Sequence, residues 1–374
     1  MLFAFAGVTL DRVFIFILMK HIVMLQGMGN NESGWARLAS KFGRVTLIQL
    51  VPFEHVEIWE NGHCISKGPE SSFMKTRPLD EMIFSALTIW RGITRGRKQI
   101  GSGKADVLIA ASYGLGLAAL WLRWSGRTQR VVALLTDYLP PRGSWGVCLH
   151  RRITSALMKF VVRHADEVWT VSPRIPMTAF NARNFVVPIC LDDNESQCEG
   201  RNEIGYVGFP SPDHALDILF EICKKHRFRL NIIGDSPYLQ SIKHLAPDNA
   251  VFHGVINDPA KVKHVISRCF CGYAVYRNTG PTSYSYYGIP SKTFYYFASN
   301  TPVVTSLTAH FTANIEKFGV GRVVEPTMEQ IEKEILQLQK EFSAYFEAIN
   351  VFRKNWNAEA EQFHYDRMAV LMAD

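Results

Sequence analysis

A single lysine stands out in the segment GIPSKTFYYFASNTPVVTS, residues 288–306. Pro290 favours the first turn of a helix, because proline has no N–H to lose there and its φ is already helical. Lys292 would then lie near the helix N-terminus, where the macrodipole disfavours a cation unless an anion joins it. Free N–H groups and an ammonium together suit a phosphate or diphosphate. We therefore predict that Lys292 binds such a group; the alternative is a lysine whose stem packs while its head reaches water.

The elements that precede this segment begin with short apolar runs separated by helical patterns. The predicted strands of this first half are 21–26, 44–51, 56–60, 105–112, 130–137 and 167–172. The predicted helices are 33–43, 79–100, 115–124 and 148–164. Apolar strands that alternate with helices indicate a parallel sheet covered on both faces, and hence one Rossmann-like domain.

A polar stretch, residues 191–203, interrupts the alternation and is predicted to be a linker. The alternation then restarts, with predicted strands at 204–209, 228–235, 250–256, 270–277 and 302–306 and predicted helices at 213–226, 237–246 and 258–268 and at Lys292. The predicted fold class is α/β, with two Rossmann-like doubly wound parallel-sheet domains that face a cleft and a C-terminal helical tail. The predicted divisions are 1–18, an apolar extension; 19–190, the N-terminal domain; 191–203, the linker; 204–326, the C-terminal domain; and 327–374, helices that partly return to the N-terminal domain.

Composition narrows the class of protein. The chain has 374 residues, 47% of them apolar, and this length favours two domains. Its formal net charge of +7 suits nucleic acid, an anionic membrane surface or phosphorylated substrates, but no long Lys/Arg run or zinc-finger spacing supports nucleic acid. The seven cysteines form no CxxC pair, which fits reduced thiols in a cytoplasm and argues against a zinc module.

The first residues resemble a membrane segment only in part. Asp11 and Arg12 split them into apolar runs of 10 and 7 residues, which are short for a spanning helix. We expect residues 1–18 to be an extension from an upstream start, with Met19 as the natural beginning. An interfacial anchor and a spanning segment are the alternatives.

The lysine segment resembles the nucleotide-binding segment of family-4-like GT-B glycosyltransferases, P-x-K-x-x-E-Y-x-A-x-x-x-P-V-V. The stretches IGYVGF and LNIIGDSP are similar to the strands that open their C-terminal domain. This resemblance extends over most of residues 20–370. It implies a GT-B fold and transfer of a sugar, with the N-terminal domain binding a polysaccharide or lipid-linked acceptor and the C-terminal domain binding a nucleotide diphosphate sugar, UDP-linked by preference.

Three departures from that pattern point to one group of transferases. The family's glutamate three residues after the lysine is Tyr295 here, GFPSPDHAL lacks the usual basic pair, and residues 277–292 lack the E-x7-E carboxylates of retaining members. This combination resembles the xanthan-type glucuronosyltransferases, which are inverting and membrane-associated and use an N-domain aspartate as base. A retaining family-4-like transferase and a catalytically degenerate nucleotide-binding or partner subunit remain alternatives.

The resemblance makes Asp137 the predicted catalytic base. It follows the strand in VVALLTDYLPPRG, where a carboxylate could accept the proton of the acceptor hydroxyl. The alternative is that Asp137 caps the following turn. No DxD-like pair indicates a metal ion, so we predict metal-independent transfer without a cofactor, in which Lys292 and its helix end hold the diphosphate.

Other residues are predicted to bind substrates. Arg277 is a second candidate for the diphosphate, or a solvent-paired rim arginine, and Tyr276 either stacks on the base or belongs to the core. Backbone at Gly254 and Val255 would meet the base. Gly27 and Gly29 lie in the loop that is predicted to approach the acceptor. Gly208, Ser291 and Tyr295 are predicted to contact the donor.

Two stretches combine tryptophan with basic residues, IWRGITRGRK at 89–98 and WLRWSGR at 121–127. Such a face suits an anionic membrane surface, and the alternative is a solvated basic helix surface. We therefore expect a cytoplasmic protein, peripheral on the inner face of the cell membrane. A nucleotide-dependent oxidoreductase or epimerase is disfavoured, because QGMGNNESG is no G-x-G-x-x-G fingerprint.

Overall fold

The structure is a computed structural model. It describes residues 21–26, 32–50, 53–68, 71–72, 81–136, 138, 145–188, 191, 202–256, 258–278, 280–281, 283, 286–288, 291–306 and 312–373. The extension 1–18, the acceptor-loop glycines Gly27 and Gly29, and the predicted base Asp137 lie outside these residues.

The first sheet has strand order β4-β3-β2-β1-β6-β7-β8-β9, and most of its strands are parallel. The parallel strands are β1 (His21–Gln26), β2 (Arg44–Gln49), β6 (Ala105–Ala111), β7 (Thr128–Leu135), β8 (Glu167–Thr170) and β9 (Asn184–Val186). Their apolar runs are buried, as in β6 and β7, and they form the core of the N-terminal domain.

One edge of this sheet corrects the prediction of a purely parallel sheet. β3 (Phe53–Glu60) pairs antiparallel with β2, with β4 (His63–Lys67) and with the short β5 (Ser71–Ser72). Asn61 and Gly62, both at positive φ (51° and 83°), form a two-residue hairpin turn between β3 and β4. Such a turn joins antiparallel strands. All five residues of β4 are exposed, and its sequence, HCISK, shows no alternation of apolar and polar residues. The sequence therefore did not predict this strand.

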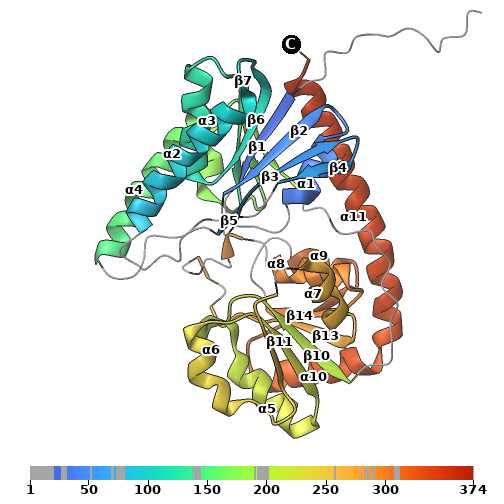
Figure 1. Cartoon of the computed structure of the whole chain (residues 1–374). Helices are drawn as coiled ribbons and strands as arrows, with labels where there is room; N and C mark the ends of the chain where they lie inside the picture. The colour runs from blue at the N-terminus through green and yellow to red at the C-terminus, as the bar shows by residue number, and fades with distance from the viewer. Residues whose placement is uncertain are drawn as a thin grey trace, which may run out of the picture.

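Three long helices lie side by side along the first sheet: α2 (Glu81–Ile100), α3 (Tyr113–Trp124) and α4 (Trp145–His164) (Figure 1). A side chain on Gly96 would begin 2.7 Å from Leu122, and one on Gly116 would begin 2.5 Å from Val161. Glycine at these two positions therefore lets α3 pack closely between α2 and α4. α1 (Glu32–Ala39) and the last helix lie on the other side of the sheet (Figure 1).

The second sheet is parallel throughout, with order β12-β11-β10-β13-β14-β15. Its strands are β10 (Glu203–Val207), β11 (Arg229–Ile233), β12 (Val251–Gly254), β13 (Cys269–Ala274), β14 (Val303–Ser306) and β15 (Gly321–Val324). Its helices are α5 (Leu216–His226), α6 (Pro237–Ile242), α7 (Pro259–Ile266), α8 (Ser291–Ala298), α9 (Thr312–Lys317) and α10 (Met328–Lys340). The predicted pair of Rossmann-like α/β domains with a C-terminal helical tail is thus confirmed, and β9 and β15 are short strands that the pattern did not predict.

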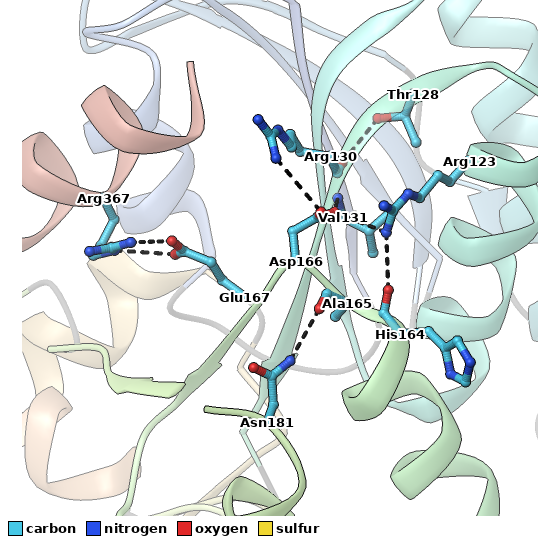
Figure 2. A network of polar contacts seen from close by, with 10 residues as sticks. All are labelled: Arg123, Thr128, Arg130, Val131, His164, Ala165, Asp166, Glu167, Asn181 and Arg367. Carbon is cyan, nitrogen blue, oxygen red and sulfur yellow. Dashed lines mark hydrogen bonds and ion pairs between the residues drawn. The ribbon is translucent and has the colours of Figure 1, made fainter. Parts of the chain in front are cut away.

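The last helix, α11 (Phe342–Leu371), contacts both domains (Figure 1). In its first half, Phe352 packs against Phe297 and Phe318, at centroid distances of 5.3 and 5.2 Å. Near its end, Arg367 forms an ion pair with Glu167 at the beginning of β8 (Figure 2). None of the helices in the part of the chain that is described is both long and apolar enough to cross a membrane.

Candidate functional site

Lys292 lies in the first turn of α8, which begins at Ser291, as Pro290 led us to expect. Its side chain is only 6% exposed, so the ammonium does not reach water along a packed stem. The Nζ atom lies 3.3 Å from the hydroxyl of Tyr206 in β10. It also lies 4.4 Å from the ring centroid of Tyr206 and 5.1 Å from that of Tyr276. Aromatic faces attract a cation, but they do not neutralise it.

The environment of Lys292 disfavours its positive charge. Burial lowers the pKa of Lys292 to about 7, although the charge of Asp213 acts in the opposite direction. Among the described residues, no carboxylate forms an ion pair with this lysine. A buried cation without a carboxylate partner is costly, and an anionic ligand would supply the partner.

A neutral histidine orients the hydroxyl that meets Lys292. The Nδ1 atom of His214 accepts the backbone N–H of Ser211, at 3.2 Å, and lies 2.7 Å from the hydroxyl oxygen of Tyr206. Burial and the charge of Lys292 lower the pKa of His214 to about 3, so this ring is neutral. The Tyr206 hydroxyl also lies 3.3 Å from the carbonyl oxygen of Phe209. Because both neighbours are acceptors, the Tyr206 proton points towards them and a lone pair is left for Lys292.

Sequence reasoning missed Tyr206 and His214. Tyr206 was part of an apolar strand, and His214 is separated from Lys292 by most of the second domain. One local signal exists in SPDH, since Ser211 and His214 form a capping box around the 3₁₀ turn Pro212–His214. That signal predicts a turn after β10 but not its contact with α8.

Three glycines with positive φ lie at the carboxyl ends of neighbouring strands of the second sheet. Gly208, Gly234 and Gly254 end β10, β11 and β12 with φ of 120°, 131° and 66°. A side chain on Gly234 would begin 1.9 Å from the carbonyl oxygen of Gly208, so only glycine fits there. A side chain on Gly208 would begin 3.7 Å from Cε of Lys292. Bare backbone thus lies directly beside the lysine at the carboxyl ends of the strands, where open α/β sheets bind ligands.

The other predicted donor residues lie in different surroundings. Tyr276 is buried beneath Lys292, and its backbone is tied to the Ser306 hydroxyl through both its N–H and its carbonyl oxygen. Arg277 pairs with Asp217 in the first turn of α5. Val255, beyond Gly254, is 69% exposed. Tyr295 packs half-buried against the core, and Ser291 is the first residue of α8. The structure therefore gathers Lys292, Tyr276 and Gly208 at one point, and gives Arg277 a carboxylate partner of its own.

The predicted base follows β7, which ends at Leu135, and its neighbour Tyr138 reaches the second domain. The rings of Tyr138 and Tyr287 meet edge to face, at 4.7 Å. The guanidinium of Arg174 lies 4.5 Å from the ring centroid of Tyr286. The chain just after β7 is thus in contact with the chain just before α8. No group of three or more His, Cys, Asp or Glu side chains that could hold a metal ion occurs within the described residues.

Two α/β domains, one with a mixed sheet and one with a parallel sheet, together with a C-terminal helix that contacts both, define the GT-B fold. Neither a protein-family model nor a curated protein matches the chain. Solved structures do match it. Sucrose-phosphate synthase from Thermosynechococcus elongatus shares 13% identity at a TM-score of 0.68, over 95% of this chain and 100% of the other.

Two further structures are similar over nearly the same length. The catalytic domain of starch synthase IV from Arabidopsis thaliana, bound to ADP and acarbose, shares 10% identity at a TM-score of 0.62, over 95% of this chain and 100% of that domain. Trehalose-6-phosphate synthase from E. coli, bound with UDP-2-fluoro glucose, shares 11% identity at a TM-score of 0.62, over 94% of this chain and 99% of the other. At such identities the likeness establishes the fold.

Proposed function

We propose that the protein is a glycosyltransferase that moves a sugar from a nucleotide diphosphate sugar, UDP-linked by preference, to a polysaccharide or lipid-linked saccharide. The observation that carries this proposal is the buried Lys292, which lies in the first turn of α8 beside the bare backbone of Gly208. A diphosphate there would meet an ammonium and the first N–H groups of the helix. Similar folds solved with ADP or with UDP-2-fluoro glucose support a nucleotide ligand.

In the proposed reaction, the bond between the anomeric carbon and the diphosphate oxygen breaks and negative charge develops on the diphosphate. Lys292 and the N-terminus of α8 stabilise that charge, without a metal ion. Contacts of the base with the backbone at Gly254 and Val255, and of the donor with Ser291, Tyr295 and Gly208, belong to the same proposal. The pairing of Arg277 with Asp217 makes Arg277 a weaker candidate for the diphosphate.

Asp137 is the proposed base. It would take the proton of the acceptor hydroxyl as that oxygen bonds to the anomeric carbon from the face opposite the leaving group, so the sugar configuration inverts. Contact between Tyr138 and Tyr287 supports this assignment, because it joins the chain beside Asp137 to the chain that leads into α8. Gly27 and Gly29 would contact the acceptor. A lipid-linked acceptor would require the protein to work at the cytoplasmic face of a membrane.

The donor site is tested by calorimetric titration with UDP, GDP and ADP. We expect one of these nucleotides to bind selectively, and Lys292→Ala to weaken its binding about 10–100-fold, the loss expected for a hydrogen bond to a charged group. Lys261→Ala is the matched control, because Lys261 is an exposed lysine on α7 of the same domain. Absence of binding by all three nucleotides, or an unchanged affinity of Lys292→Ala, would overturn the donor site.

The chemical step is tested with Asp137→Asn. This variant should keep its nucleotide affinity and lose turnover, whereas a residue that only caps a turn would leave turnover nearly unchanged. NMR analysis of the product's anomeric configuration separates the mechanisms. Retained donor configuration would favour a retaining transferase, and nucleotide binding without any turnover by the wild type would favour a degenerate binding subunit.

A further inference from the structure

The positive charge of the chain is concentrated in one layer of helices. α2, α3 and α4 contain nine Lys and Arg residues and one acid, Glu81, which gives a net charge of +8. The whole chain has a net charge of +7, so all of the remaining residues together are close to neutral. Because these three helices lie side by side on the N-terminal domain, their charge acts from one side of the molecule (Figure 1).

The outer face of α4 bears three exposed apolar side chains, where a surface helix normally bears polar ones. Leu149, Ile153 and Phe160 are 40–44% exposed, and their spacing of four and seven residues places them on one face of the helix. The core is contacted by a different face, on which Val161 and Val162 are fully buried. A helix with an apolar stripe on its solvent side indicates an interaction surface.

The apolar stripe continues onto α3 and α2. Trp124 on α3 is 62% exposed, and its ring contacts Phe160 of α4 at a centroid distance of 6.2 Å. Trp121, one turn earlier, lies under the guanidinium of Arg97 of α2, at 5.6 Å. Tryptophan and arginine side chains from neighbouring helices are thus in contact with one another, and they do not form separate apolar and charged zones.

We propose that this surface binds an anionic membrane, and we call it the docking face. Its apolar members are Trp90, Trp121, Trp124, Leu149, Ile153 and Phe160, and its exposed basic members are Arg97, Lys98, Arg152 and Arg163. Tryptophan is favoured at the level of lipid headgroups, and basic residues are attracted to an anionic lipid surface. Nucleic acid would use the charge but not an aliphatic stripe such as Leu149 and Ile153, and so fits the face less well.

Docking through this face would also place the acceptor. α4 begins at Trp145, eight residues after Asp137 in the chain, so the face lies close in sequence to the proposed base. This step rests on the proposed function: an acceptor held by its lipid in the membrane would reach the N-terminal domain from the docking face. Membrane binding itself does not depend on transfer and is measured without it.

The proposal is tested by sedimentation of the full chain with vesicles of phosphatidylcholine alone or mixed with phosphatidylglycerol. We expect binding only to the anionic vesicles, and binding that weakens as salt rises. Trp124→Ala with Phe160→Ala, and separately Arg97→Gln with Arg152→Gln, should each weaken it at least about tenfold, because the first pair removes apolar area that would enter the headgroup region and the second removes two charges that attract the anionic surface. Controls that change the same residue classes elsewhere are Leu336→Ala with Tyr365→Ala, and Lys224→Gln with Lys261→Gln.

Equal binding by wild type and docking-face variants would overturn the proposal, because the vesicles would then be held by another part of the chain. Failure to bind anionic vesicles would overturn it as well. So would self-association, measured by analytical ultracentrifugation without lipid, that Trp124→Ala with Phe160→Ala abolishes, since the face would then bind a second copy. Nucleotide titration of the same variants should give wild-type affinity, which separates failure of the docking face from failure of the donor site.

Discussion

Two basic side chains of this protein, Arg367 and Lys292, differ in how their positive charge is compensated. Arg367 of α11 meets both carboxylate oxygens of the buried Glu167 (Figure 2). The same carboxylate also accepts the indole N–H of Trp169, at 3.0 Å. Lys292 meets two aromatic rings and one hydroxyl. The first cation is fully paired within the chain and joins α11 to the N-terminal domain. The charge of the second is only partly compensated, which is expected for a residue that binds an anionic ligand.

The two cations lie at opposite ends of parallel strands. Close to Glu167, Asp166 accepts the backbone N–H of Val131 at 2.8 Å and pairs with Arg123 at 3.1 Å (Figure 2). This network lies around the start of β8, and carboxylates in it compensate the arginines. Lys292 lies instead beside Gly208, at the carboxyl end of β10. Charges at the former position stabilise the fold, whereas the latter position is where open α/β sheets bind ligands.

The largest effect is expected for Glu167→Gln. This change leaves Arg367 without its carboxylate, and breaking a buried pair in this way costs about 3–5 kcal/mol of unfolding free energy. Urea unfolding measures the loss. Nucleotide affinity of the folded variant should stay at the wild-type value, and a loss of stability below about 1 kcal/mol would show that the pair does not hold α11 to β8.

Lys292→Met should do the opposite and stabilise the protein. The pKa of Lys292 is lowered from 10.5 to about 7, so folding disfavours its charged form. Below about pH 7, Lys292 is protonated in both the folded and the unfolded chain, so the full free-energy cost of burying its charge applies. Between about pH 7 and pH 10, Lys292 is protonated only in the unfolded chain, so the free energy of unfolding rises with pH. Methionine removes the penalty, and we expect a gain on the order of 2 kcal/mol at pH 6 that shrinks as pH rises.

Urea unfolding of Lys292→Met at pH 6 and pH 9 checks this prediction, and Lys261→Met serves as the exposed control. A destabilised Lys292→Met would mean that the lysine serves the fold, as Arg367 does. A more stable variant that has lost nucleotide binding would show that Lys292 is kept for its ligand at a cost in stability.

The pH dependence of nucleotide affinity tests the charge of Lys292 without a mutation. Only protonated Lys292 attracts a diphosphate, and its pKa in the free protein is about 7. Above about pH 7, affinity for UDP or the selected nucleotide should therefore fall by up to tenfold per pH unit, while the ligand, whose second ionisation lies near pH 6, keeps its charge. Calorimetry in HEPES and in Tris should detect proton uptake on binding near pH 8. Unchanged affinity between about pH 7 and pH 9 would contradict a role for the lysine's charge.

The sequence predicted the helices and strands around this site better than the side-chain contacts within it. Apolar strands alternating with helices predicted both domains, and Pro290 predicted the place of Lys292 in α8. The burial of Lys292 could not be predicted, because it depends on Tyr206, which is 86 residues away in the chain. Likewise the partner of Arg277 is 60 residues distant. Local patterns specify elements, but contacts between distant elements depend on how the sheet orders its strands.

The smallest expected effect tests the hydroxyl that orients Lys292. Tyr206→Phe keeps the ring under the ammonium and removes the acceptor at 3.3 Å, while His214 loses the hydroxyl at 2.7 Å. The two aromatic rings still hold the ammonium, so we expect loss of this one positioning hydrogen bond, about 1 kcal/mol, to lower nucleotide affinity about fivefold. Tyr273→Phe is the matched control, because this buried tyrosine of β13 donates its hydroxyl to Ala215. Comparable loss of stability in both variants, with loss of affinity in Tyr206→Phe alone, would show that the hydroxyl positions the lysine. An unchanged affinity would mean that the two aromatic rings suffice to hold the ammonium in place.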